Sequence, residues 1–296
     1  MSRGLATPVA LAVLLAAGCG GGDEPAPNRA EAVVDAAGEP PYVGSLDVNP
    51  RDGSLLMATN AGTFRVRRGS DRIERVRVRI SAGGQSIAAR GGLAFAFTGP
   101  DRLVGSGHPG ADSPQLLGLI RSSDGGRTWR NVSRLGQSDL HALAQRGRTV
   151  VASDGQRAQV LVSEDAGENF GTRPSPLRLI DMDASPDSAE KLVGSSEGGL
   201  YSSADGGSTW RARDSVPNSR LAWPAPGALF RVDGDGAVRR SGDAGLSWKR
   251  VGKVEGEPHA LAAADARRLF AADIDGVIRG SRDGGRTWSV RARPGP

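Results

Sequence analysis

The residues with the most evident chemical potential form a short octet near the end of the chain, SRDGGRTW, from Ser281 to Trp288. A carboxylate among small residues, beside an arginine and a tryptophan, is suited to binding a sugar or transferring a proton. An octet that differs at one position, SSDGGRTW, begins at Ser122. The alternative is that the octet is a turn that the fold needs many times.

The octet recurs five times, and its spacing favours this structural alternative. The copies start at residues 122, 163, 203, 241 and 281, so the intervals are 41, 40, 38 and 40 residues. A period near 40 residues with several short strands per unit is typical of a β-propeller. Five similar loops in a radial array cannot form one active site. We therefore predict that each Asp accepts hydrogen bonds from its turn and that each aromatic side chain packs between sheets. These structural residues are Asp124, Trp129, Asp165, Phe170, Asp205, Trp210, Asp243, Trp248, Asp283 and Trp288.

The segments between the octets have the pattern of short strands separated by tight turns. From Leu177 to Arg213, an apolar run is followed by a Pro-Asp turn, a short strand, a Gly turn and two strands that flank the octet. A sixth unit begins at Tyr42 and has no recognisable octet. We predict an all-β fold, a six-bladed β-propeller with four-stranded antiparallel blades, over residues 42–293.

The octet resembles the Asp-box, or BNR repeat, Ser-x-Asp-x-Gly-x-Thr-Trp, of sialidases and other propellers. The run GSGHPGADSPQLLGLIRSSDGGRTW and the later DLHAL resemble a family of exported bacterial BNR-repeat lipoproteins, often labelled sialidase-like or glycosyl hydrolase. A more distant resemblance is to the photosystem II assembly propellers, which act by binding proteins. The resemblance implies that Asp-boxes join the third and fourth strands, on the face opposite the ligand. The first blade of that lipoprotein family usually contains more His than PYVGS and ATNAG contain here.

The catalytic groups that the sialidase resemblance implies are not evident. Sialidases use an arginine triad, an Asp acid/base and a Tyr nucleophile with a Glu partner. The chain has two Tyr residues: Tyr201 lies in a strand before an octet, and Tyr42 opens the first blade. Other catalytic motifs and complete calcium loops are absent from the sequence. The sequence therefore assigns no catalytic residue, no cofactor and no metal, and it favours a protein that is not an enzyme.

A second group of polar residues is predicted on the face away from the octets. When the blades are aligned on their first strands, the residues that open these inner strands are Tyr42, Gly92, His141, Arg178, Arg220 and His259. His108 lies in a long second-blade loop on the same face. His is a common metal ligand, and Arg binds carboxylate or phosphate. The hypothesis is that six residues surround a polar or anionic ligand, or a metal ion; the alternative is a hydrated channel without a ligand. The six are Tyr42, His108, His141, Arg178, Arg220 and His259.

The first 41 residues have the features of an export signal and a tether. The apolar run from Leu5 to Ala17 is too short to span a bilayer, and it is followed by Cys19, the only cysteine. LLAAGC resembles a lipoprotein signal. We predict a signal peptide over residues 1–18, a lipidated Cys19 and a flexible tether over residues 19–41. An ordinary signal peptide with an incidental Cys is the alternative.

The charge of the chain does not indicate a nucleic-acid partner. The formal net charge is +5, and the densest basic run, from Arg65 to Ile80, alternates in the manner of a solvated edge strand. We predict an exported, extracytoplasmic monomer that contacts the membrane through its lipid only and binds a protein, glycan or small anionic ligand. The alternatives are a glycoside hydrolase with non-standard catalytic residues and an assembly factor for an envelope protein complex.

Overall fold

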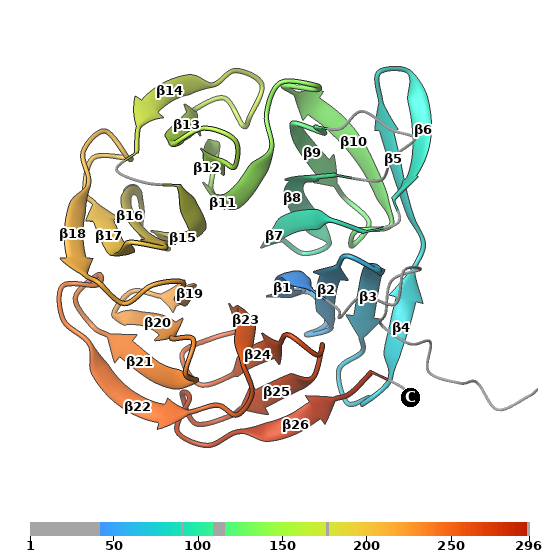
Figure 1. Cartoon of the computed structure of the whole chain (residues 1–296). Helices are drawn as coiled ribbons and strands as arrows, with labels where there is room; N and C mark the ends of the chain where they lie inside the picture. Colours follow the sequence, from blue (N-terminus) through green and yellow to red (C-terminus); the bar gives the residue numbers. More distant parts are fainter. Residues whose placement is uncertain (1–41, 90, 109–115, 176–177, 295–296) are drawn as a thin grey trace, which may run out of the picture.

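The computed structural model describes residues 42–89, 91–108, 116–175 and 178–294, and in these ranges the chain is all-β. Six sheets are arranged radially around a central opening (Figure 1). The predicted six-bladed β-propeller is therefore confirmed. The predicted signal peptide, Cys19 and the tether lie outside the described residues.

Five of the six blades are four-stranded antiparallel sheets whose strands are consecutive in the sequence. In blade 1 the strands are β1 (Val43–Val48), β2 (Leu55–Thr59), β3 (Gly62–Val66) and β4 (Ile73–Val76). Blade 3 contains β11 (Leu140–Arg146), β12 (Thr149–Asp154), β13 (Gln159–Ser163) and β14 (Gly171–Pro174). Blade 4 contains β15 (Leu179–Ser185), β16 (Ser188–Ser196), β17 (Gly199–Ser203) and β18 (Arg211–Asp214). Blade 5 contains β19 (Arg220–Ala225), β20 (Ala228–Val232), β21 (Ala237–Ser241) and β22 (Lys249–Lys253). Blade 6 contains β23 (Pro258–Ala263), β24 (Leu269–Asp273), β25 (Ile278–Ser281) and β26 (Ser289–Ala292).

Blade 2 has two strands more than the four that the repeat predicts. Its four blade strands are β7 (Leu93–Gly99), β8 (Arg102–Gly107), β9 (Leu119–Ser122) and β10 (Thr128–Ser133). The segment that leads into the blade forms a hairpin of β5 (Val78–Ala82) and β6 (Gln85–Ala89), and β5 pairs in parallel with the outer strand β10. The two glycines of its turn, Gly83 and Gly84, both have positive φ. Such a turn reverses a strand tightly, and the hairpin thereby covers the outer edge of this blade.

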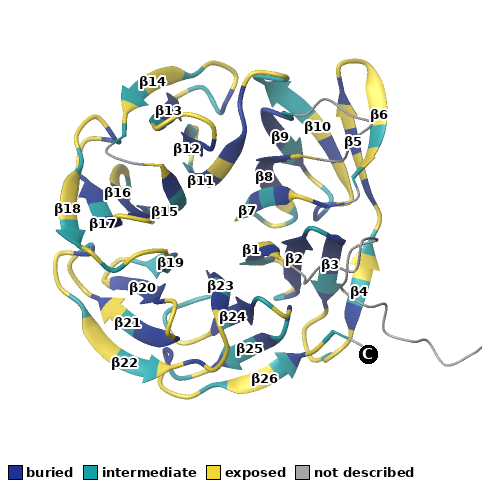
Figure 2. Ribbon diagram, in the orientation of Figure 1, coloured by how far each residue is buried: buried dark blue, intermediate teal, exposed yellow. Residues whose placement is uncertain are grey.

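The hydrophobic core is divided among the six joints between neighbouring blades. Buried side chains line the facing surfaces of the sheets, whereas the outer strands are more exposed (Figure 2). Leu56 of blade 1 packs with Leu103 of blade 2, and Phe230 of blade 5 packs in one cluster with Leu269 of blade 6. Because each joint has its own cluster, every blade is held by its two neighbours.

The Asp of each octet closes the turn between the third and fourth strands of its blade. In blade 4, Asp205 Oδ1 accepts hydrogen bonds from the Ser203 hydroxyl and the Thr209 N–H, each at 2.8 Å. Asp205 Oδ2 accepts one from the Thr209 hydroxyl at 2.7 Å. These hydrogen bonds, led by that of the Thr209 hydroxyl, lower the pKa of Asp205 to about 2. The other four octets repeat the arrangement, with Asn or Ser in place of Thr in two of them.

The residue after the Asp has a left-handed backbone in every octet. Glycine occupies the position in three of them, but Ala166 and Ala244 adopt it with φ of 68° and 59°. A left-handed conformation is strained for alanine. The turn therefore imposes this conformation even where the sequence does not supply glycine.

The aromatic residue of each octet packs into the joint with the preceding blade. Trp129 belongs to the cluster that contains Leu56 of blade 1, and Phe170 packs against the cluster that contains Leu119 of blade 2. The indole N–H of Trp129 also donates to the carbonyl of Gly126 at 3.0 Å. Each octet thus stabilises its own turn and fills the space beside the sheet of the preceding blade.

We expect Asp205→Ala to lower the melting temperature by several degrees, because three donors of the turn lose their acceptor. Thermal unfolding followed by circular dichroism measures the effect. Glu164→Ala is the matched control, since Glu164 is an exposed carboxylate at a variable octet position. An unchanged melting temperature in Asp205→Ala would contradict a structural role for the carboxylate.

Candidate ligand site at the channel mouth

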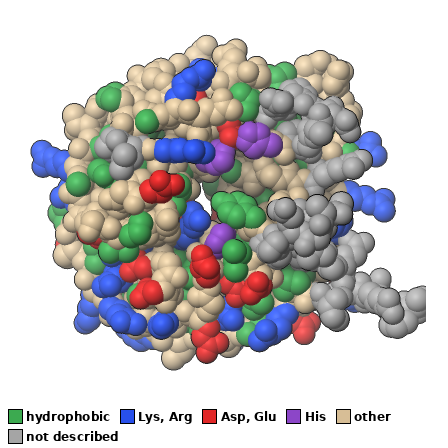
Figure 3. Space-filling model, in the orientation of Figure 1, with side chains coloured by type: hydrophobic (Ala, Val, Ile, Leu, Met, Phe, Trp, Pro, Cys, Tyr) green, Lys and Arg blue, Asp and Glu red, His purple; other side chains and the backbone are tan. Residues whose placement is uncertain are grey.

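The octets and the starts of the inner strands lie at opposite ends of the propeller. The octet turns contact the turns between first and second strands, as the N–H of Gly125 shows by donating to the carbonyl of Asp101. In an antiparallel blade, the start of the first strand lies beside the turn between second and third strands, at the other end. Figure 3 looks onto this other face, where the His side chains gather around the central opening among charged residues. We call the opening on this face the channel mouth.

Five of the six residues of the hypothesis line one cavity at the channel mouth. The cavity has a volume of about 1140 Å³. A second cavity of about 500 Å³ continues along the channel between the inner strands. The structure therefore brings together residues from five blades that are widely separated in the sequence. The five are Tyr42, His141, Arg178, Arg220 and His259.

Arg178 and Arg220 differ from the third arginine of this cavity in their pairing, although the charge of Arg220 also acts on Asp181 in the channel. Neither guanidinium makes a hydrogen bond or ion pair with the described residues, and Arg220 Nε is buried without an acceptor. Arg178 directly precedes β15 and is exposed, whereas Arg220 opens β19 and also lines the channel. By contrast, Arg239 in the same cavity donates to Asp233 at 2.9 Å. Arg178 and Arg220 are thus the cations available to an anion at the mouth.

Tyr42 and His259 pack against each other beside these arginines. Their rings meet edge to face, with centroids 5.2 Å apart. The Tyr42 side chain is half exposed, whereas that of His259 is mostly buried, and His259 Nδ1 has no hydrogen-bond partner. Burial, together with the charge of Arg220, lowers the pKa of His259 below its usual value. These surroundings therefore disfavour the charged form of the imidazole.

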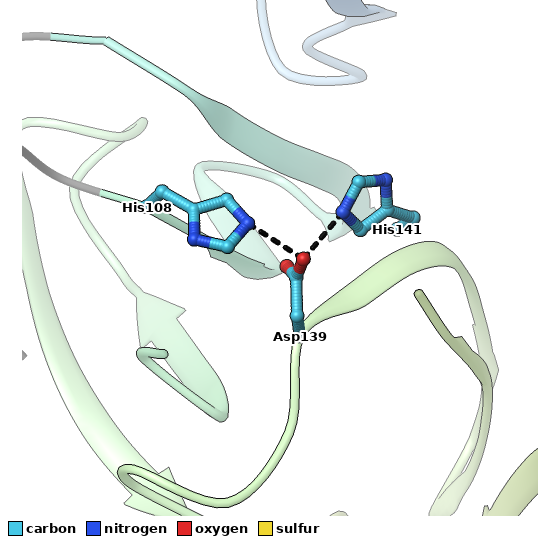
Figure 4. Close-up of side chains that lie close together, drawn as sticks. All are labelled: His108, Asp139 and His141. Atoms are coloured by element: carbon cyan, nitrogen blue, oxygen red, sulfur yellow. Dashed lines mark hydrogen bonds and ion pairs between the residues drawn. The ribbon is translucent and has the colours of Figure 1, made fainter. Parts of the chain in front are cut away.

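His108, the sixth residue of the hypothesis, meets His141 across the joint between blades 2 and 3 (Figure 4). One ring nitrogen of each histidine contacts the same oxygen of Asp139. His108 Nε2 is 2.6 Å and His141 Nε2 is 2.5 Å from Asp139 Oδ2. Burial raises the pKa of Asp139, but the hydrogen bonds and charges of His141 and His108 outweigh this effect and lower it. Asp139 is the central residue of the cluster, and the alignment of inner strands did not identify it.

Two glycines allow the histidines to approach. A Cβ atom on Gly155, in the turn between β12 and β13, would lie 2.5 Å from His141 Cδ2, so a larger residue there would displace the imidazole from its present position. Gly92 has φ of 68° and comes so near the backbone of His108 that a Cβ would lie 2.7 Å from its carbonyl oxygen. The carbonyl of Gly92 accepts a hydrogen bond from the N–H of His108. At the start of its inner strand, blade 2 thus has Gly92 where the other blades have a polar residue, and Gly92 positions His108.

Below the mouth, the channel contains carboxylates that the sequence analysis did not single out. Asp47 and Asp181 project from β1 and β15, and Asp183 follows two residues later. Burial raises the pKa of Asp47 and of Asp181 to about 6, and it also raises that of Asp183. Each carboxylate accepts a backbone N–H from the next blade: Asp47 from Phe97 at 2.6 Å and Asp181 from Leu221 at 2.8 Å. These groups join inner strands, and burial disfavours their ionised forms.

Comparison with known proteins shows the fold. No protein-family model and no curated protein matches this sequence. An ancestral GH74 enzyme has a TM-score of 0.55 at 14% identity, with 86% of this chain and 37% of that chain covered. The GH74 xyloglucanase from Xanthomonas campestris has a TM-score of 0.53 at 14% identity, with coverages of 89% and 46%. YCF48 bound to a D1 peptide has a TM-score of 0.53 at 15% identity, with coverages of 85% and 96%.

These likenesses establish a shared β-propeller architecture, and propellers of this shape include both enzymes and a peptide-binding protein. The chain spans less than half the length of the two GH74 chains. In the part of the chain that the structure describes, there is no helix with the length and apolarity needed to cross a membrane.

We expect the channel carboxylates to make stability depend on pH. Because the folded-state pKa of Asp181 is about 6 and its usual value is 3.8, its contribution to stability is full below about pH 4 and is lost as the pH rises through 6. The melting temperature of the wild type should therefore fall relative to that of Asp181→Asn as the pH rises from 4.5 to 7.

Scanning fluorimetry across this pH range measures the difference. Asp187→Asn is the control: Asp187 is exposed and its pKa is lowered, so its contribution does not change in this window. A wild-type advantage over Asp181→Asn that stays constant with pH would contradict the assignment.

Proposed function

We propose that this chain is a binding module whose ligand docks at the channel mouth and is anionic. The observation that carries the proposal is the presence of Arg178 and Arg220 in the cavity of about 1140 Å³, where neither makes a hydrogen bond or ion pair with the described residues. Buried polar groups normally have hydrogen-bond partners, so the orphaned Nε of Arg220 indicates a missing acceptor. An Arg guanidinium binds a carboxylate or phosphate with two parallel hydrogen bonds. Tyr42 and His259 supply an aromatic wall beside this acceptor.

The proposal includes the location of the module. The signal-like sequence and Cys19 support an exported, lipid-anchored chain at the cell envelope, with the mouth free to meet ligands outside the membrane. In this proposal the chain is monomeric, touches the membrane through its lipid only and does not bind nucleic acid. Its ligand is a protein segment, a glycan or a small molecule that carries negative charge. A protein ligand would make the module an assembly factor for an envelope complex, and YCF48 with its D1 peptide is a propeller of this shape with a bound peptide.

A second candidate function is glycoside hydrolysis, and one observation favours it. Asp47 and Asp181 line the channel and have pKa values raised to about 6, as a general acid requires. Against this function, Asp47 and Asp181 both accept backbone hydrogen bonds that join neighbouring blades. Their raised pKa values follow from burial in a structural role. We therefore rank binding above hydrolysis.

We expect the double variant Arg178→Ala/Arg220→Ala to weaken binding of the anionic ligand by about 100-fold or more, since each charge-assisted hydrogen bond contributes about 1.5–3 kcal/mol. The probes are an array of sialylated, uronate-containing, sulfated and neutral glycans, and a set of acidic and neutral peptides. Hits are then titrated by calorimetry against the wild type and the variant.

Arg102→Ala is the matched control, because Arg102 is an exposed arginine at the opposite, octet-bearing end of blade 2. Equal affinity of the double variant and the wild type for every anionic hit would overturn the proposal. Binding restricted to acidic peptides would favour the assembly role. Release of a free sugar from an array glycan, abolished by Asp181→Asn, would favour the hydrolase.

A further inference from the structure

Three metal-binding side chains converge at one edge of the channel mouth. His108 follows β8, Asp139 precedes β11 and His141 lies within β11. One potential ligand atom from each lies within 4.8 Å of the others. Figure 4 shows the two imidazole rings directed at the same carboxylate from opposite sides. The three side chains therefore converge on one position.

The chemistry of this donor set selects one class of cation. Two imidazole nitrogens and one carboxylate form the three-ligand set of catalytic zinc sites and of non-haem iron sites. Magnesium and calcium prefer oxygen ligands only, so the histidines disfavour them. A first-row divalent ion such as Zn²⁺ fits the donors present.

The separations between the donors require a small adjustment to admit an ion. Zinc–nitrogen bonds of about 2.0–2.1 Å in a tetrahedron place neighbouring ligand atoms roughly 3.3 Å apart. The present Nε2-to-Oδ2 separations are 2.6 Å for His108 and 2.5 Å for His141. Each ring must therefore withdraw by less than about 1 Å. The side chains of His108 and His141 are 48% and 43% exposed, so they have room to move.

The carboxylate at the centre is a buried group with an unused oxygen. The Asp139 side chain is only 5% exposed, and its Oδ1 is buried without a hydrogen-bond partner. A buried carboxylate oxygen without a donor is unfavourable unless a cation or a donor completes it. Together with the two imidazoles on the other oxygen, this free acceptor is consistent with a cation as the missing partner.

Two hydrogen bonds hold the backbone of the Asp139 segment in place. The N–H of Gly155 donates to the carbonyl of Asp139 at 2.6 Å, and the N–H of Leu140 donates to Ser106 Oγ of blade 2 at 3.0 Å. The second bond ties the Asp139 segment to the blade that supplies His108. A site whose ligands are preorganised loses little conformational entropy on binding the ion.

We propose that His108, Asp139 and His141 bind a first-row divalent metal ion, of which Zn²⁺ is the representative, with open coordination positions on the solvent side. The inference goes beyond the proposed function, because it concerns a cation and does not depend on Arg178 or Arg220. His141 also lines the cavity of the mouth, so the ion would lie at its rim. A bound ion there would give an anionic ligand a further point of attachment.

The test is titration of the metal-depleted full chain, purified without a histidine tag, with Zn²⁺ alone. Calorimetry should give one ion per chain in the wild type. His108→Ala and His141→Ala should each weaken binding by at least about 100-fold, because losing a direct ligand costs more than losing a ligand's hydrogen-bond partner, which costs about 10- to 100-fold. Zn²⁺ should also raise the melting temperature of the wild type but not of these variants.

Two controls locate the site. His259→Ala removes the remaining histidine of the mouth, and Arg178→Ala/Arg220→Ala removes the proposed anion site. Both should bind Zn²⁺ as the wild type does, so failure of the anion proposal leaves this result interpretable. The inference is overturned if the wild type shows neither heat of binding nor a melting shift. It is also overturned if His108→Ala and His141→Ala bind as tightly as the wild type, or if His259→Ala loses binding equally.

Discussion

The inner strand of every blade turns an unpaired edge towards the central channel, and the N–H groups along that edge need acceptors. Side chains of the neighbouring blade supply them where the structure shows such bonds. Asp47 of blade 1 accepts from Phe97 of blade 2, and Asp183 of blade 4 accepts from Trp223 of blade 5. Because donor and acceptor lie on different blades, each bond fixes the distance between two inner strands. The width of the channel and the positions of the residues that open these strands follow from this constraint.

The carboxylates of the octet turns and those of the channel have opposite electrostatics. Asp205 and Asp243 lie in exposed turns whose donors favour the ionised form, and their pKa values fall to about 2. Asp47 and Asp181 lie in the channel, where burial outweighs their hydrogen bonds and raises the pKa. Both groups have structural partners. Asp139 differs from both, because its described partners are imidazoles from two blades rather than the turn or the channel backbone.

The repeat predicted the fold well because everything that the octet turn needs lies close together in the sequence. The turn needs a hydrogen-bond acceptor, a residue with a left-handed backbone and an aromatic side chain that fills the joint, and all three occur within eight residues. The hairpin of β5 and β6 was not predicted, although Gly83-Gly84 between alternating segments is a signal for it.

At the mouth, the two arginines and His259, which the alignment of the inner strands selected, line one cavity. Asp139 was not identified because the alignment considered one residue per blade. Asp139 and His141 are two positions apart in the sequence, so their side chains share a face. The approach of His108 depends on Gly92, whose contact with the backbone of His108 cannot be inferred from the spacing of residues.

The joint between blades 6 and 1 differs from the other five. Blade 1 has no octet, so this joint receives no octet aromatic, and its cluster combines residues such as Phe64 and Ile278 from distant parts of the chain. Arg291 of blade 6 reaches across it to the carbonyls of Arg67 and Ser70. Among the described residues, no segment of the chain links blade 6 to blade 1 directly, and side-chain packing and these hydrogen bonds close the circle. The propeller is in this respect a linear array of repeats whose two ends are held together by side chains, and we expect local opening of the ring to begin at this joint.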